Sequence, residues 1–247
     1  METHMKDILQ DIVAHTHQLG IIPLAKISST STETQIEAMA EDRSVIITAK
    51  TKAPVDEFEG IFGMPNLNKL DIHLKCPEYK EHSKISVVRA ERNGEVIPTG
   101  LHFENAAGDF ENDYRFMSTE VVNEKLKTVK FKGAAWAIEF VPAMASIQKL
   151  KFQATAHSEE QTFQVSTDGS NLVFTFGDAS THAGNFVFQA NVDGKLKQTW
   201  SWPVNQVMSI LNLTGDKTMR ISDVGAMQIT VDSGIAEYNY ILPAQSK

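Results

Sequence analysis

The side chains that could perform catalysis or bind a metal are few in this sequence, and their spacing is unfavourable. His15 and His17 lie within a segment of helical periodicity, where residues two apart point in different directions and cannot easily share a metal ion. Asp56, Glu57 and Glu59 could supply general acid–base chemistry, but carboxylates at a helix start are more simply explained as partners of the helix dipole. We therefore expect neither a metal site nor an acid–base centre.

Short motifs of known enzyme classes are also missing. The sequence contains no nucleophile elbow, no glycine-rich phosphate-binding loop and no zinc-type cysteine spacing. Its single cysteine, Cys76, excludes an internal disulfide and an all-cysteine metal site within one chain, and we expect it to fill space in a strand. The sequence therefore predicts a protein that is not an enzyme and needs no cofactor.

The composition is that of an ordinary globular chain without a membrane segment. The 247 residues are 42% hydrophobic and 22% charged, and this length accommodates one large β-rich domain or two domains of ordinary size, of which we favour two. No apolar run approaches the roughly 20 residues that cross a bilayer, and the N-terminus has no apolar signal core. We therefore expect a cytoplasmic protein, in the host cell if a phage encodes it, that does not contact membranes.

The formal net charge of −8 argues against simple adhesion to nucleic acid, because phosphate binding relies on clustered lysine and arginine. The distribution of charge could still support such a role. Acidic residues gather at 104–113 and 157–160, whereas lysines are dense at Lys125, Lys127, Lys130, Lys132, Lys149 and Lys151. For any single lysine, an ordinary solvated surface is the simpler interpretation.

Four segments have the apolar spacing of helices. We expect them at 4–19, from Pro54 to Pro65, from about Pro142, and from Pro203 to Gly215. Proline suits a first helical turn because its missing N–H would be unpaired there, and glycine commonly ends a helix. Strand-like runs fill the remainder: three within 23–52, then 69–75, 84–92, 95–103 and 113–117, and later 161–166, 171–177, 185–192, 196–202, 217–221, 226–232 and 235–242.

Both halves of the chain repeat one order of elements: helix, meander, short proline-initiated helix, meander. This order predicts a structural duplication, although two unrelated α+β domains would give a similar pattern. In each half, two helices must cover one face of an antiparallel sheet. We place the first domain at 1–117, a connector that could run extended along a sheet edge at 118–129, and the second domain at 130–247.

Three segments carry a resemblance to a known family. They are Phe58-Glu-Gly-Ile-Phe-Gly-Met-Pro-Asn-Leu67, Asp223-Val-Gly-Ala-Met-Gln-Ile-Thr-Val-Asp232 and Tyr238-Asn-Tyr-Ile-Leu-Pro-Ala244. Together with the order of elements along the chain, they resemble the sliding clamps, or processivity factors, of DNA polymerases. The similarity is greatest to clamps of T-even-like tailed phages, which share the ring fold of proliferating cell nuclear antigen.

The resemblance implies an α+β fold of two clamp domains, each with antiparallel sheets and two helices on one face. Three chains would close head to tail into a homotrimeric ring around double-stranded DNA, and closure would give the unpaired sheet edges partners. Topological linkage would replace affinity, so an acidic chain could serve on DNA of any sequence. The residues that would face DNA are Lys6, Gln148, Lys149, Lys151, Asn205, Gln206 and Asn212.

The expected second helix does not suit a DNA channel, because its carboxylates would face phosphates. The helix could be rotated, its carboxylates could lie outside the channel, or neighbouring lysines could shield it. The shielding candidates are Lys50, Lys52 and Lys69.

The resemblance also implies partners. The ring would tether the replicative DNA polymerase for processive synthesis, and the polymerase and an ATP-driven clamp loader would dock short peptides in a hydrophobic pocket between the domains. For this chain it nominates Val121, Val122, Leu126, Ile241, Leu242 and Pro243. We expect the last three to follow the final strand, although each residue could equally finish the sheet or cover the core.

Two other classes of protein stay open. A phage structural or tail-associated, ring-forming β-rich protein would bind other structural subunits and ignore an ATP-driven loader. A small hydrolase would turn over some substrate, but no motif nominates one. Stimulation of long-product synthesis by a cognate polymerase would separate both classes from a clamp.

Overall fold

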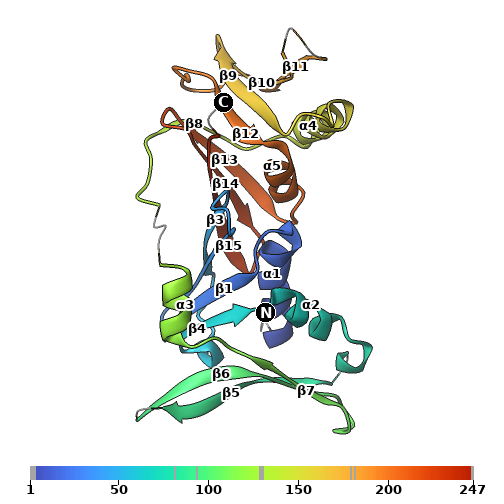
Figure 1. The fold of residues 1–247 in the computed structure, drawn as a ribbon, viewed down its shortest axis with the longest axis vertical. Helices are drawn as coiled ribbons and strands as arrows, with labels where there is room; N and C mark the ends of the chain where they lie inside the picture. Colours follow the sequence, from blue (N-terminus) through green and yellow to red (C-terminus); the bar gives the residue numbers. More distant parts are fainter. Residues whose placement is uncertain are drawn as a thin grey trace. The chain divides into compact units, whose positions relative to one another are not determined.

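The computed structural model describes residues 4–80, 82–92, 94–127, 131–178, 180 and 182–245. The chain divides into two compact units (Figure 1). The first comprises Met1–Lys130 and Ser233–Tyr238, and the second comprises Phe131–Asp232 and Asn239–Lys247. Both are built from antiparallel strands and short helices. No described helix combines the length and the apolar character that crossing a membrane requires.

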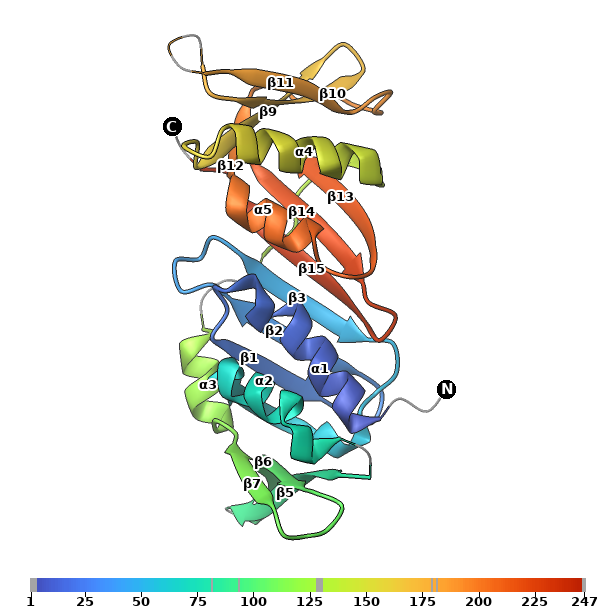
Figure 2. The ribbon, with the colours of Figure 1, turned by 90° about the vertical axis from the view of Figure 1, so that its right-hand side faces the viewer.

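In the first unit, two helices cover one face of a four-stranded antiparallel sheet (Figure 2). The sheet has the order β4-β1-β2-β3 and consists of β1 (Leu24–Ser29), β2 (Thr34–Met39), β3 (Ile46–Thr51) and β4 (Gly60–Pro65). The helices are α1 (Met5–His15) and α2 (Leu67–Lys75), and the 3₁₀ turns are η1 (His17–Leu19), η2 (Asp56–Phe58) and η3 (Pro77–Tyr79). Helix α1 forms where predicted because its buried residues recur at helical spacing: Ile8, Leu9, Ile12 and Val13.

A three-stranded sheet and a third helix complete the first unit. The sheet has β6 (Glu95–Glu104) between β5 (Lys84–Arg92) and β7 (Glu111–Arg115). Of the predicted Asn93-Gly94 turn, Asn93 lies outside the described residues.

Helix α3 (Thr119–Lys125) occupies the predicted connector, so the expectation of an extended segment is wrong. The helix forms because it can bury Val122 against β4, where a Cβ at Gly63 would lie 2.8 Å from Val122 Cγ2. Glycine at position 63 therefore permits the close approach of helix and strand. The end of the predicted connector, residues 128 and 129, lies outside the described residues.

The second unit again combines two sheets with two helices. One sheet has the order β11-β10-β9-β12, and the other has the order β15-β14-β13-β8. Their strands are β8 (Trp136–Phe140), β9 (Thr162–Asp168), β10 (Asn171–Phe176), β11 (Gly184–Gln189), β12 (Trp200–Pro203), β13 (Asp216–Ser222), β14 (Ala226–Asp232) and β15 (Ala236–Pro243). The helices are α4 (Met144–Ala156) and α5 (Val204–Leu211).

The two units repeat one arrangement, as the sequence predicts. From α1 in the first unit and from α4 in the second, each runs helix, four strands, helix and three strands. The sheet order β4-β1-β2-β3 matches β12-β9-β10-β11. Strands β5, β6 and β7 correspond in the same way to β13, β14 and β15. Strands β3 and β11 therefore occupy equivalent sheet edges, and β7 and β15 are equivalent strands. In the first unit, residues 233–238 line the end of β3, where Lys52 N donates a hydrogen bond of 2.8 Å to Ile235 O.

The second helix of the first unit lies later in the chain than predicted. Residues 54–65, expected as a helix, form η2 and β4, and residues 69–75, expected as a strand, lie in α2. The spacing of Phe58 and Phe62 fits a helix, but Phe62 is buried because β4 pairs along its whole length with β1. The buried stripe of the actual helix consists of Leu67, Leu70 and Leu74.

The later position of α2 also corrects the expectations for Cys76 and for the acidic residues at 56–59. Cys76 follows α2 and is half-buried, so it does not fill space in a strand. Asp56, Glu57 and Glu59 lie outside any α-helix, and the objection that an acidic second helix would face DNA disappears.

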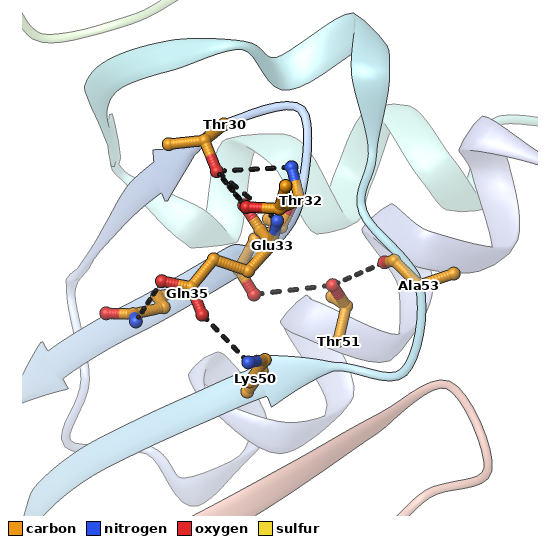
Figure 3. A network of polar contacts seen from close by, with 8 residues as sticks. Thr30, Thr32, Glu33, Gln35, Lys50, Thr51 and Ala53 are labelled. Atoms are coloured by element: carbon orange, nitrogen blue, oxygen red, sulfur yellow. Dashed lines mark hydrogen bonds and ion pairs between the residues drawn. The ribbon is translucent and has the colours of Figure 1, made fainter.

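Lys50, one of the lysines expected to shield those carboxylates, has another partner. It lies on β3 and its Nζ is 2.8 Å from Glu33 Oε2 (Figure 3). This hydrogen bond is the main reason that the pKa of Glu33 is lowered. The turn before Glu33 is closed by Thr30, whose Oγ1 accepts hydrogen bonds of 3.3 Å from the backbone N–H groups of Thr32 and Glu33 (Figure 3).

Candidate functional site

The helices α1, α2, α4 and α5 differ in charge from the chain as a whole. They carry five lysines and three aspartates, whereas the chain has a formal charge of −8. Two of the aspartates have partners, because Asp71 pairs with Lys75 at 2.6 Å and Asp11 accepts hydrogen bonds from the hydroxyls of Ser233 and Tyr238. The helices are thus weakly basic elements of an acidic protein.

Helix α4 presents most of its polar residues to solvent. Ile147 and Leu150 are buried and fix the rotation of the helix, which leaves Gln148, Lys149 and Lys151 exposed on the other side. This agrees with the predicted surface, and contact with DNA stays a prediction. Met144 is 68% exposed because it opens the helix ahead of the buried stripe.

Helix α5 carries the predicted amide residues. It is held by four buried residues, Val204, Val207, Ile210 and Leu211. Asn205 and Asn212 are exposed and Gln206 is half-buried, so this surface is polar and uncharged. In the segment that follows the helix, Lys217 Nζ donates to Leu213 O at 2.5 Å and to Gly215 O at 2.8 Å. Burial lowers the pKa of Lys217.

Lys6 lines a cationic cavity that sequence reasoning did not find. The cavity, of about 720 Å³, adjoins the start of α1 and the segment after α2. Lys6 Nζ donates to the Tyr79 carbonyl, and the other basic residues are His4, Lys80, His82 and Lys84, against one carboxylate at Asp7. The sequence places Lys80 and Lys84 four residues apart, but only the fold brings them to Lys6. A phosphate is the kind of group that such a cavity attracts.

The first half of the predicted partner pocket lies on α3. Val121 is 43% exposed, Val122 is fully buried against β4, and Leu126 is half-buried. Leu126 borders a hollow of about 30 Å³ that is also lined by Met39 and Ile46. Val122 is therefore a core residue, and the accessible apolar groups on this side are Val121 and Leu126.

The other three residues of the predicted partner pocket belong to the second unit, and two of them are buried in its core. Residues 236–243 form β15, so Ile241, Leu242 and Pro243 lie within the final strand and do not follow it. Leu242 is fully buried and its carbonyl accepts a hydrogen bond of 3.1 Å from Trp202 Nε1, Ile241 is 5% exposed, and only Pro243 is exposed. An exposed apolar residue of this unit that the sequence analysis did not identify is Val224, which is 74% exposed on the turn between β13 and β14.

Replacing Leu242 by serine is expected to destabilise the second unit. The change removes a fully buried side chain and leaves a cavity that costs about 2–5 kcal/mol, and the new hydroxyl adds to the loss. Pro243→Glu, one residue further along the same strand, alters an exposed position and serves as the control. Urea unfolding followed by tryptophan fluorescence measures both. Equal midpoints for the two variants would contradict the buried placement of Leu242.

Of the two histidines His15 and His17, His15 has a structural role. The His15 ring is buried, stacks on Tyr238 with ring centroids 4.4 Å apart, and places Nδ1 3.3 Å from Asp11 Oδ1. In the part of the chain that the structure describes, no group of three or more histidine, cysteine, aspartate or glutamate side chains could hold a metal ion.

Solved structures share this fold over nearly the whole chain. PCNA of A. fulgidus, bound to the C-terminal region of FEN-1, has a TM-score of 0.68 at 12% identity and covers 98% of this chain and 95% of its own. PCNA of Thermococcus kodakaraensis has a TM-score of 0.66 at 11% identity, with coverage of 96% and 97%. Proliferating cellular nuclear antigen of Entamoeba histolytica has a TM-score of 0.64 at 10% identity, with coverage of 98% and 94%. No family profile and no curated protein sequence matches the chain.

The chain therefore has the two-domain fold of PCNA-type sliding clamps, which confirms the predicted fold class. At these identities the likeness concerns the fold alone. The predicted special similarity to phage clamps stays a prediction.

Proposed function

We propose that this protein is a DNA sliding clamp that encircles duplex DNA and tethers a polymerase for processive synthesis. The observation that carries the proposal is the charge of the helices: in a chain of formal charge −8, helices α1, α2, α4 and α5 carry five lysines against three aspartates. A helix layer of this kind tolerates phosphates without binding them tightly, which is what sliding requires. The cationic cavity at Lys6, Lys80 and Lys84 adds a contact of the same chemistry.

The repeat of the two units supports the proposal that the chain closes into a ring. The edge of β3 is lined by residues 233–238, whereas its equivalent, β11, pairs only with β10 among the described strands. Strand β7, the equivalent of β15, likewise pairs only with β6 in the described part of the chain. We infer that β11 of one copy pairs with β7 of the next. Because the two edges differ, the contact is head to tail, and a head-to-tail contact whose rotation closes makes a ring. We expect that ring to contain three chains, with its sheet edges paired.

The partners that we propose are a DNA polymerase and an ATP-driven clamp loader, both docking by short peptides. Support comes from the solved neighbour in which the C-terminal region of FEN-1 is bound to A. fulgidus PCNA. On the present chain, Val121 and Leu126 are the exposed and half-buried apolar groups of α3 that could receive such a peptide. A weak apolar contact suits partners that must exchange on one ring.

The purified protein is expected to form a trimer that stimulates long-product synthesis by its cognate polymerase on a primed circular template. Light scattering over a dilution series measures the mass, and gel analysis of products measures processivity. Linearising the template is the control, because an encircling ring slides off free ends. A folded protein that stays monomeric at micromolar concentration, or stimulation that is equal on linear and circular templates, would contradict the proposal.

A further inference from the structure

We propose that the peptides docking on the first unit carry aspartate or glutamate beside their apolar anchor. This inference rests on the proposed function and specifies the chemistry of its partners. The surface concerned, here named the α3 crease, is the hollow at the end of α3 that is bordered by Glu37, Met39, Ile46, Thr48 and Leu126. It lies entirely within the first unit.

The apolar part of the α3 crease suits a single anchoring side chain. Met39 and Leu126 are both half-buried, and Ile46, which is paired with Met39 across β2 and β3, is 9% exposed. The hollow of about 30 Å³ is shallow, so it holds only part of a side chain as it stands. Methionine is the side chain best able to adjust its shape around a ligand. Because one shallow apolar anchor gives a peptide little affinity, residues around the hollow are needed to contribute further binding energy.

The residues on either side of Leu126 in the chain, which we take as the rim of the α3 crease, are positively charged. Lys125 and Lys127 precede and follow Leu126, and both are exposed. Within the described chain, no carboxylate forms an ion pair with either lysine. The carboxylate that borders the crease, Glu37, is already paired with Lys26 at 2.8 Å. An occupant that packs on Leu126 therefore lies close to two exposed lysines that no described carboxylate neutralises.

The acidic residues of α3 do not cancel this charge at the crease. Val122 and Leu126 are four residues apart and share the face that packs on the sheet. Glu120 and Glu124 are also four residues apart, and by helical spacing they lie on the opposite side, where both are exposed. Complementary charge across a rim accelerates association and selects partners, so an acidic flank is favoured over a basic one.

The test uses two synthetic peptides of equal length that share a Leu-Phe core, one flanked by aspartates and the other by lysines. Calorimetric titration into the full-length protein at low salt is expected to show the acidic peptide binding about fivefold to tenfold more tightly, the effect of two exposed ion pairs. The preference is expected to shrink at high salt because the charges are screened. Lys125→Glu with Lys127→Glu should reverse it, and Leu126→Ser should weaken both peptides.

The matched control is Lys149→Glu with Lys151→Glu, which changes the net charge equally on α4 of the other unit and should leave the preference intact. Equal affinity for the two peptides, tighter binding of the basic peptide, or no binding of either would overturn the inference. Trimer mass and polymerase stimulation are measured on the same preparations. If these persist while the preference is absent, the clamp function stands and only the charge of the partner is wrong.

Discussion

Reversing the charge of α4 by Lys149→Glu together with Lys151→Glu is expected to abolish processive synthesis at physiological salt while leaving the trimer intact. Both lysines are exposed on a helix that has no acidic residue, and neither lies on a sheet edge. In a ring, each substitution is repeated in every chain, so the channel wall becomes acidic and repels the phosphates that pass it. The effect should be large because the change adds repulsion as well as removing attraction.

Primer extension on a closed circular template, at several salt concentrations, measures this loss. The variant Lys195→Glu with Lys197→Glu makes the same change of charge at exposed positions between β11 and β12 and is the matched control for the DNA effect. It should still be loaded and still encircle DNA, which crosslinking of the closed ring on a circle can detect. If the α4 variant matches the parent protein at every salt concentration, these lysines do not face DNA, whereas the ring itself would still stand.

Placing an acidic residue on β11 is expected to convert the trimer into folded monomers. Val187 is 40% exposed on β11, the edge that we propose to meet β7, and β7 contributes the exposed carboxylates of Glu111 and Asp113. Val187→Asp therefore adds to β11 a charge of the same sign as these carboxylates, whereas Val187→Lys adds a charge of the opposite sign. We expect the lysine variant to remain a trimer and the aspartate variant to dissociate.

Val96→Asp is the control for the edge variants. Val96 is 64% exposed and lies on β6, where it pairs with Glu91 of β5, outside the two strands of the proposed contact. Light scattering gives the mass of each variant, and circular dichroism confirms that it is folded. A trimer that survives Val187→Asp at every dilution, or identical behaviour of the aspartate and lysine variants, would show that β11 and β7 do not form the contact.

The sequence by itself determined the elements whose signals are local. Helix α1 is readable from the spacing of Ile8, Leu9, Ile12 and Val13, and α5 from its apolar stripe between a proline and a glycine. The repeated order of elements is also visible along the chain, because turns and alternation report strands one at a time. The resemblance then led to the fold class that the solved neighbours confirm.

The tertiary structure decided whatever depends on partners distant in sequence. Phe58 and Phe62 have a spacing that helix and strand both accommodate, and the pairing of β4 with β1 selected the strand. Leu242 appears as an accessible terminal residue in the sequence, but β15 and Trp202 bury it. Lys80 and Lys84 gain significance only beside Lys6, more than seventy residues earlier in the chain, because the fold brings them to one cavity. Local periodicity records which face of an element is apolar, whereas the contacts that cover that face are long-range and leave no local signal.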